Sequence, residues 1–417
     1  MPAPRLFHGW LVVGGAFTVL ATCYALQFSY GVLMPHMVAD LGWGRSALSA
    51  PFSAYILLYS WLSYLAGALT DRLGPRTVIA LGALGLGSGY ALLGTTEELW
   101  EPYVYLGAFA AVGGSVAFVP CNATVIRWFV RRRGIALGIA SAGISVAAIL
   151  GPLVTAALLD VFSWRETLYW LGAGGAVLVL LASRVMTRDP EAKNLAPDGD
   201  PLEATTKRPA AGATELEGQT LAQARRSSAF WLVMACLFFT WVPVFFPFVH
   251  LPSHALEQGI AASEAATLLA SLGIGGLLGR LLSGSLTDKL GRKPGLVLSI
   301  ALQALAFEGL GESQAYTSLA LWTFVLGMGY SGVSVLFPAL LGDLFGRAHV
   351  GAIVGFVFAT VGSAAAAGPY LAGLIFDATG SFDLAFRAGT VLNAISLAVL
   401  AFLRTKSPSA RSPVPRI

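Results

Sequence analysis

The segment GALTDRLGPR at residues 67–76 recurs, with few changes, as GSLTDKLGRK at residues 284–293. Other residues far from this motif repeat at the same offset of 217 positions. They are Gly134 and Gly351, Gly138 and Gly355, Gly151-Pro152 and Gly368-Pro369, and Asp160 and Asp377. Separate matches at one ungapped spacing indicate an internal repeat, so the sequence predicts two halves with the same fold.

The composition places both halves in a membrane. Hydrophobic residues make up 56% of the 417 residues and charged residues only 12%, against about 25% charged in soluble domains. Twelve apolar runs can cross the ~30 Å hydrocarbon layer as helices, and they lack the ~10-residue alternation of membrane β-barrels. These runs are residues 10–35, 46–70, 77–95, 103–129, 134–159, 164–185, 229–250, 261–286, 294–311, 315–341, 350–376 and 382–403. We therefore expect an all-α membrane protein whose twelve transmembrane helices form two pseudosymmetric six-helix bundles.

The stretch 186–228 interrupts the apolar pattern. It contains TRDPEAKNLAPDGDPLEATTKRPAAGATELEGQ, which is rich in Pro, Gly, Ala and charges of both signs. A segment of this composition does not bury a hydrophobic core. The predicted organisation is a six-helix bundle at residues 1–185, a cytoplasmic linker at 186–228, and a second six-helix bundle with a short cytoplasmic tail at 229–417.

The basic residues predict the orientation. With both termini inside, the cytoplasmic segments hold all but four of the 26 Lys and Arg residues. Arg45, Arg165 and Arg387 lie in predicted external loops, and Arg280 lies within the eighth run. An excess of basic residues on the cytoplasmic side is the usual bias in membrane proteins. We expect a multi-pass protein of the cytoplasmic (inner) membrane, with both termini cytoplasmic and a first run too long for a cleaved signal peptide.

Sequence patterns typical of several other protein classes do not occur. Cys23, Cys121 and Cys236 lie in apolar runs without a CxxC pair, which favours buried free thiols over disulfides or zinc ligands. The chain has no HExxH motif, phosphate-binding loop, nucleophile triad or pair of catalytic carboxylates. Its net charge of +4 is accounted for by the cytoplasmic bias. We expect a protein that is not an enzyme, needs no cofactor or metal, and binds no nucleic acid.

Arg280 is the basic residue that the predicted loops leave inside an apolar run. A mid-membrane arginine costs roughly 2.5–3.5 kcal/mol on insertion scales, and the charged cluster at Asp288 is ~12 Å away along a helix. The predicted spans place no Asp or Glu near mid-membrane, and Glu308 is the nearest. Two interpretations remain open. The guanidinium fork binds the carboxylate of a substrate, or the arginine donates to backbone carbonyls across a helix interface.

Polar and aromatic residues near the middle of other runs are further candidates for substrate binding. They are Tyr24, Gln27 and Phe28 in the first run, Asn122 in the fourth, Tyr330 and Phe337 in the tenth, and Phe358 in the eleventh. A short organic anion needs one charge clamp, one or two hydrogen-bonding dipoles and apolar walls. Taken singly, each of these residues packs more often than it binds.

A pair of histidines follows in the seventh run. His250 ends the predicted span on its outer side, and His254 lies four residues later. Histidine titrates near physiological pH, so His250 is a candidate proton relay. The alternative is a histidine at the membrane interface.

The repeated motif carries a family resemblance. GALTDRLGPR and GSLTDKLGRK resemble the loop signature of the major facilitator superfamily. Four other segments resemble its monocarboxylate transporter branch and the neighbouring oxalate/formate exchangers. They are RWFVRRRGIALGIASAG (127–143), SWRETLYWLGA (163–173), VHLPSHALEQG (249–259) and GLLGRLLSGSLTD (276–288). The chain thus resembles a bacterial homologue of the vertebrate monocarboxylate transporters. The resemblance covers nearly the whole chain except the linker and tails.

The resemblance implies a latch at the loop signature. Asp71 would hold the two halves together on the cytoplasmic face in the outward-open state, with Arg127 as a partner. Asp288, in the second copy of the motif, would have a weaker role. An aspartate at such a position can accept hydrogen bonds from a helix N-terminus or from an arginine. The alternative is that Asp71 is a solvated residue that fixes the topology.

Two departures from these relatives narrow the expected substrate. The oxalate exchangers pair the arginine of span 8 with a lysine in span 11, whereas residues 350–376 contain no basic residue. This argues against a dicarboxylate. The proton-coupled vertebrate relatives carry a lysine in span 1 and an aspartate four residues before the arginine. In this chain the first span has neither Lys nor Arg, and the residue four positions before Arg280 is Gly276. Any coupled proton would therefore use different residues.

The sequence therefore predicts a secondary active transporter of short-chain monocarboxylates, such as L-lactate or pyruvate. We expect alternating access with proton symport, in a chain that acts as a monomer. Its partners would be the lipid bilayer, the small monocarboxylate anion and a proton. Two alternatives stay open: an organic-anion exchanger without proton coupling, and a membrane sensor that binds an anion but moves none. The two complete repeats and the lack of an effector domain disfavour the sensor.

Overall fold

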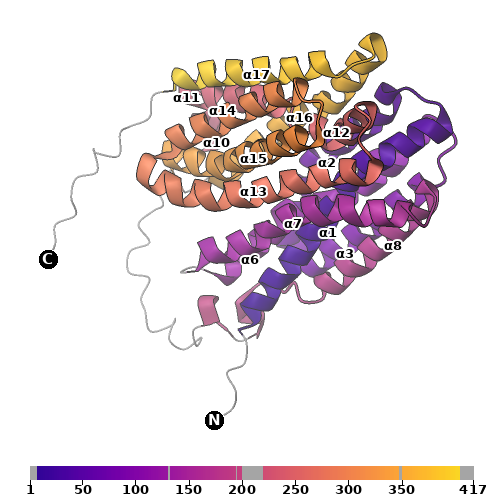
Figure 1. The fold of residues 1–417 in the computed structure, drawn as a ribbon. Coiled ribbons are helices and arrows are strands. Elements are labelled where there is room, and N and C mark those ends of the chain that lie inside the picture. Colours follow the sequence, from indigo (N-terminus) through magenta and orange to yellow (C-terminus); the bar gives the residue numbers. More distant parts are fainter. Residues whose placement is uncertain (1–6, 130–131, 194, 200–218, 347–349, 404–417) are drawn as a thin grey trace.

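Helices dominate the computed structural model (Figure 1), which describes residues 7–129, 132–193, 195–199, 219–346 and 350–403. The first half contains α1 (His8–Leu41), α2 (Arg45–Leu73), α3 (Pro75–Leu93), α4 (Glu101–Val104), η1 (Tyr105–Ala110), α5 (Ala111–Ser115), α6 (Phe118–Trp128), α7 (Arg133–Leu159) and α8 (Trp164–Ser183). The second half contains α11 (Ser228–Trp241), α12 (Phe246–Glu257), α13 (Ala262–Leu290), α14 (Arg292–Gly311), α15 (Tyr316–Phe345), α16 (Val350–Thr379) and α17 (Asp383–Ala401). The predicted all-α fold with two six-span halves is confirmed.

The repeated motif makes the same turn in both halves. Gly74 joins α2 to α3 with φ 81° and ψ 155°, and Gly291 joins α13 to α14 with φ 89° and ψ 163°. Residues other than glycine rarely adopt this backbone conformation. A single glycine therefore ends one helix and begins the next at equivalent points of the repeat.

The fourth and seventh spans are interrupted, although the sequence predicts continuous runs at 103–129 and 229–250. The fourth span is divided into α4, the π-helix η1, α5 and α6. The seventh span is divided at residues 242–245 into α11 and α12. Pro243 lies within this break and Pro247 directly after it, at the start of α12. A proline removes a backbone donor and clashes with the preceding helical turn.

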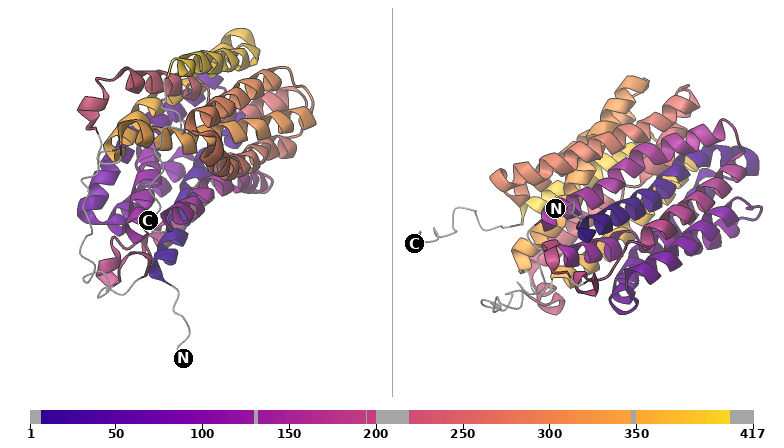
Figure 2. Two further views of the ribbon diagram at one scale, coloured as in Figure 1. Left: turned by 90° about the vertical axis from the view of Figure 1, so that its left-hand side faces the viewer. Right: turned by 90° about the horizontal axis from the view of Figure 1, so that it is seen from below.

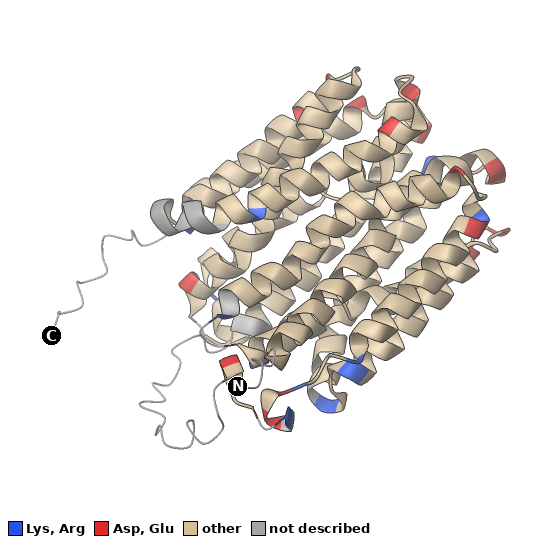
Figure 3. Ribbon diagram, turned by 60° about the horizontal axis from the view of Figure 1, so that its bottom comes forward, with Lys and Arg blue, Asp and Glu red and all other residues tan. Residues whose placement is uncertain are grey.

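Eleven of the described helical segments are long and apolar enough to span a membrane. The remaining span, α2, is less apolar, yet its 29 residues extend ~43 Å at ~1.5 Å per residue. Leu65, Leu69 and Leu73 on this helix are 46–54% exposed, as expected for a surface that faces lipid. Charged residues gather at the two ends of the bundle, and the helices between them are almost free of charge (Figure 3). Twelve spans therefore remain the best description.

The two halves lie side by side (Figure 2) and meet mainly through α2 with α16, α7 with α13, and α1 with α12. Glycines allow the closest approaches. A Cβ atom on Gly31 of α1 would lie 2.0 Å from the carbonyl oxygen of Phe248 in α12. A Cβ atom on Gly362 of α16 would lie 2.1 Å from Ser60 Oγ in α2. No side chain fits at such distances, so these glycines set how closely the halves pack.

Charged residues join the halves at the end of the bundle opposite the termini. Asp377 of α16 accepts hydrogen bonds from the backbone N–H groups of Arg45 (3.1 Å) and Ser46 (3.0 Å), and from the Ser46 hydroxyl. Arg45 also pairs with Glu257 of α12. We call these four residues the Asp377 clamp. At the other end of the bundle, α6 and α13 stand apart (Figure 1).

Both described ends of the predicted linker contact helices. They include the short helical turns η2 (Pro190–Lys193), η3 (Pro197–Gly199) and α10 (Leu221–Ala224). Asp189 pairs with Arg127 of α6, with Oδ1 and Nη1 3.2 Å apart. The backbone N–H of Gln219 donates to the carbonyl oxygen of Phe345 at the end of α15, at 2.8 Å. The first described part of the linker is thus attached to the first half and the last part to the second half.

Candidate functional site

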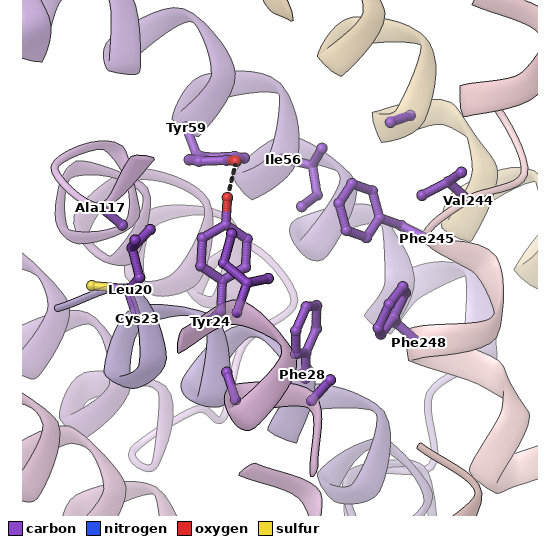
Figure 4. Packing of buried hydrophobic residues seen from close by; sticks show 14 of the residues in the cluster. Leu20, Cys23, Tyr24, Phe28, Ile56, Tyr59, Ala117, Val244, Phe245 and Phe248 are labelled. Atoms are coloured by element: carbon purple, nitrogen blue, oxygen red, sulfur yellow. Dashed lines mark hydrogen bonds between the residues drawn. The ribbon is translucent and has the colours of Figure 1, made fainter. Parts of the chain in front are cut away.

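An aromatic cluster lies where the two halves meet. It consists of Tyr24, Phe28, Tyr59 and Phe118 from the first half and Trp241, Phe248, Tyr330, Phe337 and Phe358 from the second. Phe118, Tyr330 and Phe358 are half-buried, and the other members are buried. Figure 4 shows the neighbourhood of Tyr24, Phe28 and Phe248. Every aromatic candidate predicted from the sequence belongs to this cluster.

Rings from opposite halves are in direct contact within the cluster. Phe28 stacks on Phe248, with ring centroids 4.4 Å apart, and Phe118 stacks on Phe358 at 5.5 Å. Tyr59 meets the edge of Phe358 at 6.3 Å. Such arrangements stabilise aromatic pairs beyond the area that they bury. The interface between the halves is therefore lined by apolar walls at this level.

Trp241 joins the cluster members of the second half. This residue ends α11, directly before the break in the seventh span. Its ring lies 6.1 Å from Tyr330, 6.3 Å from Phe337 and 6.4 Å from Phe358. The predicted candidates of spans 10 and 11 thus meet on one tryptophan that the sequence analysis did not single out.

Hydroxyl and amide groups accompany the rings of the first half. The Tyr24 and Tyr59 hydroxyl oxygens are 2.9 Å apart, and either can be the donor (Figure 4). Tyr55 donates its hydroxyl to Oε1 of Gln27 at 3.3 Å. Nε2 of Gln27 is buried and has no hydrogen-bond partner within the described residues. Gln27 therefore lies next to the cluster with an unused donor, bonded to Tyr55 rather than to Tyr24.

Arg280 reaches from α13 in the second half to α7 in the first. Its Nη1 donates to the carbonyl oxygen of Ser141 at 3.0 Å and to Ser145 Oγ at 2.8 Å. In the described part of the chain no carboxylate pairs with it, and its Nη2 and Nε make no hydrogen bond. One nitrogen thus bonds across a helix interface, and the opposite edge of the fork makes no hydrogen bond in the described residues. Substrate binding by Arg280 stays a prediction.

A small cavity adjoins this arginine. Its walls combine one cation, hydroxyl groups and aromatic rings from both halves. They are Phe28, Ile144, Ser145, Ala148, Phe248, Leu272, Gly273, Gly276, Arg280, Tyr330 and Ser331. The volume is about 10 Å³, roughly what one water molecule needs. The lining has the chemistry of an anion site, but the space must widen before an organic acid can enter.

Asn122 lies beside the cluster. It is half-buried on α6, four residues after Phe118, and so on the same face of that helix. Its side chain makes no hydrogen bond within the described residues. Asn122 therefore has free donors and an acceptor near the stacked pair of Phe118 and Phe358, and its role in binding stays a prediction.

The predicted position of His250 is wrong. α12 continues through Pro252 to Glu257, so His250 lies inside a helix and is fully buried instead of ending a span. Its Nε2 is 2.9 Å from the carbonyl oxygen of Pro369, and its Nδ1 has no partner among the described groups. The ring lies 5.0 Å from that of Phe382. A proton relay at His250 stays a prediction, but it would act in a buried aromatic environment.

The latch residues are described only in part. Asp71 and Asp288 lie in α2 and α13, and their side chains are outside the described part of the structure. Arg127 is half-buried and pairs with Asp189 of the linker. The proposed latch between Asp71 and Arg127 therefore stays a prediction, and Asp189 is an additional partner for this arginine.

Sequence reasoning missed five residues of the site: Tyr59, Phe118, Trp241, Phe248 and Ser145. Tyr55 and Tyr59 lie four residues apart on one helix face, a signal that could have been used. Trp241 and Phe248 occur in FFTWVPVFFPF (238–248), where no aromatic residue stands out from its neighbours. Ser145 is one small residue among several in span 5, and only the contact with Arg280 distinguishes it.

Comparison with known proteins identifies relatives of the whole chain. Residues 16–307 and 244–416 match the family model of the Major Facilitator Superfamily. Monocarboxylate transporter 11 of Mus musculus is 31% identical over 390 residues, which cover 91% of this chain and 83% of the mouse protein. The human protein of the same name is 30% identical over 396 residues, with 91% and 79% covered. Monocarboxylate transporter 13 of Bos taurus is 26% identical over 383 residues, with 91% and 85% covered.

Proposed function

The chain belongs to the Major Facilitator Superfamily and is a transporter related to monocarboxylate transporters, and on that premise we propose that it carries short-chain monocarboxylates such as L-lactate or pyruvate. The observation that carries this proposal is Arg280. It is a half-buried cation at the contact between the halves, and no carboxylate pairs with it in the described part of the chain. A charge in such a place is stabilised by an anion.

The geometry of the fork favours a carboxylate. Nη1 of Arg280 is occupied by Ser141 and Ser145, which leaves the edge formed by Nη2 and Nε. Two parallel N–H groups on that edge match the two oxygens of a carboxylate. A single cation suits a single negative charge, and span 11 adds no second basic residue.

The cluster supports a small substrate. Phe28, Phe248 and Tyr330 wall the cavity next to the arginine, and apolar walls of this kind limit the length of an acid. The hydroxyls of Tyr24 and Tyr330 can bond to a 2-hydroxy or 2-oxo group. One cation, a few hydroxyls and aromatic walls are what a short hydroxy acid or oxo acid requires.

Transport requires the halves to expose this site to each side in turn. Under the predicted orientation the Asp377 clamp holds the external ends of the halves together, and the cytoplasmic ends of α6 and α13 stand apart (Figure 1). An anion shifts the balance between two conformations only by binding one of them better. A bound anion would neutralise Arg280 and let the loaded carrier close around the site. Without the anion, closing would bury an unpaired charge and would be costly.

Proton symport is part of the proposal, with His250 as the candidate relay. Its Nε2 lies against the carbonyl oxygen of Pro369, and its buried Nδ1 has no partner in the described residues, so Nδ1 is the nitrogen that would receive the proton. The specific alternative is exchange of organic anions without a proton. It would show as uptake that strictly requires anions preloaded inside.

The proposed function is tested by reconstitution. We expect purified protein in liposomes to take up labelled L-lactate, faster with an inward proton gradient than without one. Replacing Arg280 by Gln should lower uptake about thirtyfold or more, since truncating one partner of a buried charge pair costs roughly 2–5 kcal/mol. Circular dichroism and gel filtration would verify that the variant is folded.

Three outcomes decide between the alternatives. An Arg280→Gln carrier that is folded and transports as well as the parent overturns the anion-clamp proposal. Uptake indifferent to the proton gradient and dependent on preloading identifies an exchanger. Binding of lactate by calorimetry without any flux identifies an anion sensor.

A further inference from the structure

Ser145 is the side chain of the first half that bonds to Arg280 in the described structure. Its Oγ accepts from Nη1 at 2.8 Å, whereas Ser141 contributes only a backbone carbonyl oxygen. Ser145 and Arg280 also line the same cavity. We propose that Ser145 is a positioning residue for Arg280, so that the anion site is assembled from both halves. This inference rests on the proposed function and deepens it.

Close packing of α7 on α13 makes the contact possible. A Cβ atom on Gly273 would lie 2.9 Å from the backbone nitrogen of Ile149 and 2.9 Å from the carbonyl oxygen of Ser145. One on Gly276 would lie 2.8 Å from Ser331 Oγ and 3.8 Å from Ser145 Oγ. These glycines bring the helices together at the turn before Arg280. A serine side chain then suffices to reach the guanidinium.

The contact fixes how the fork is presented. A guanidinium at the end of an arginine side chain can rotate, and an unpositioned fork loses rotational entropy when it binds a carboxylate. With Nη1 held by two acceptors on α7, its plane is set before the anion arrives. The Nη2 and Nε edge is then the one left for the substrate. Ser145 acts through Arg280 and raises affinity by preorganisation.

The contact also links affinity to conformation. Ser145 and Arg280 lie on different halves, so their hydrogen bond exists only while α7 and α13 are together at this level. Separation of these helices removes both acceptors from Nη1 at once. The guanidinium then loses its orientation and the site loses affinity. Movement of the halves would thus weaken the anion's hold and help to release it.

Alanine and threonine variants at position 145 test this role. We expect Ser145→Ala to raise the KM for lactate uptake about tenfold, the loss expected for one hydrogen bond to a charged group. The maximal rate should stay near the parent value, and the melting temperature of the unliganded protein should fall by no more than a few degrees, the loss of one hydrogen bond. Ser145→Thr keeps the hydroxyl and should restore most of the affinity. Ile139→Ala is the matched control, since Ile139 lies on the same helix, is 46% exposed and does not line the cavity, and this variant should leave KM unchanged.

The outcomes separate this inference from the proposed function. If the parent neither transports nor binds any acid of a monocarboxylate panel, the proposed function fails and the inference with it. If the parent transports lactate and Ser145→Ala has the same KM, only the role of Ser145 is overturned. A KM raised equally by Ile139→Ala would show a general disturbance of α7 and would also overturn it. So would a Ser145→Thr carrier whose KM is as high as that of Ser145→Ala.

Discussion

Trp241 is packed against three rings of the aromatic cluster. It touches Tyr330, Phe337 and Phe358, which come from two different helices, and it is only 6% exposed. A fully packed indole at this point fixes the positions of three rings at once. The length of acid that fits beside Arg280 is therefore expected to depend on this tryptophan more than on any single predicted candidate.

Removing the indole should broaden the substrate range. We expect longer monocarboxylates to inhibit lactate uptake by the Trp241→Ala carrier about tenfold more strongly than they inhibit uptake by the parent. Contacts in an apolar pocket discriminate between substrates of different length by roughly 1–3 kcal/mol. Competition by acids of increasing chain length measures the effect. Phe238→Ala is the control, since Phe238 lies on the same helix and is 42% exposed. An unchanged order of competition would rule out Trp241 as a size determinant.

At the scale of elements, the Asp377 clamp connects three helices. Its carboxylate caps the N-terminus of α2 from α16, and Arg45 of α2 pairs with Glu257 of α12. A carboxylate at a helix N-terminus satisfies backbone N–H groups and interacts well with the helix dipole. Because the cap comes from the other half, this stabilisation is available only while the two ends are together.

Breaking the cap should therefore open that end of the bundle. Replacing Asp377 by Ala is expected to destabilise the arrangement in which the two ends are together by about 0.5–2 kcal/mol. The ratio of closed to open molecules at this end should then fall several-fold. Spin labels at the exposed residues Glu98 and Gln314 would report a longer and broader distance distribution. Asp160→Ala is the matched control, because Asp160 is the repeat counterpart of Asp377 and is exposed. Identical distributions for parent and Asp377→Ala would contradict the prediction.

The elements also show which parts of the fold could be predicted. Most spans were found within a few residues, because a run of apolar residues in a membrane has few alternatives to a helix. The breaks in spans 4 and 7 were not found. Proline is tolerated inside other spans, such as α16 with Pro369, so a proline in the sequence does not by itself show where a helix stops.

At the scale of the whole molecule, a ligand between the halves should stabilise both of them. A ligand that binds only the folded state adds about 2.7 kcal/mol at 100 times its Kd. We expect lactate and pyruvate to raise the melting temperature of the purified protein, and dicarboxylates of similar length to raise it much less. Thermal-shift measurements with Arg280→Gln as control test this. Stronger stabilisation by a dicarboxylate would point to a second cation and contradict the assignment of a monoanion.

The same scale explains which parts of the candidate site could be singled out from the sequence. Arg280 could be singled out because a lone charge inside an apolar run is conspicuous in any membrane sequence. Its partner Ser145 lies 135 positions away, and only the assembled halves bring the two together. The aromatic candidates were found as types of residue, but Phe28 meeting Phe248 and Phe118 meeting Phe358 depend on how the halves pack.

The two hydrogen bonds at Nη1 of Arg280 have a consequence for the leakage of chloride across the membrane. A bare guanidinium in a membrane cavity would attract chloride, which a carrier could then shuttle and so dissipate the membrane potential. Here Ser141 and Ser145 already occupy one nitrogen, and the free edge offers two parallel donors that a planar anion fits better than a sphere. Under the proposed function, the carrier would distinguish an organic acid from chloride by shape, although both have the same charge.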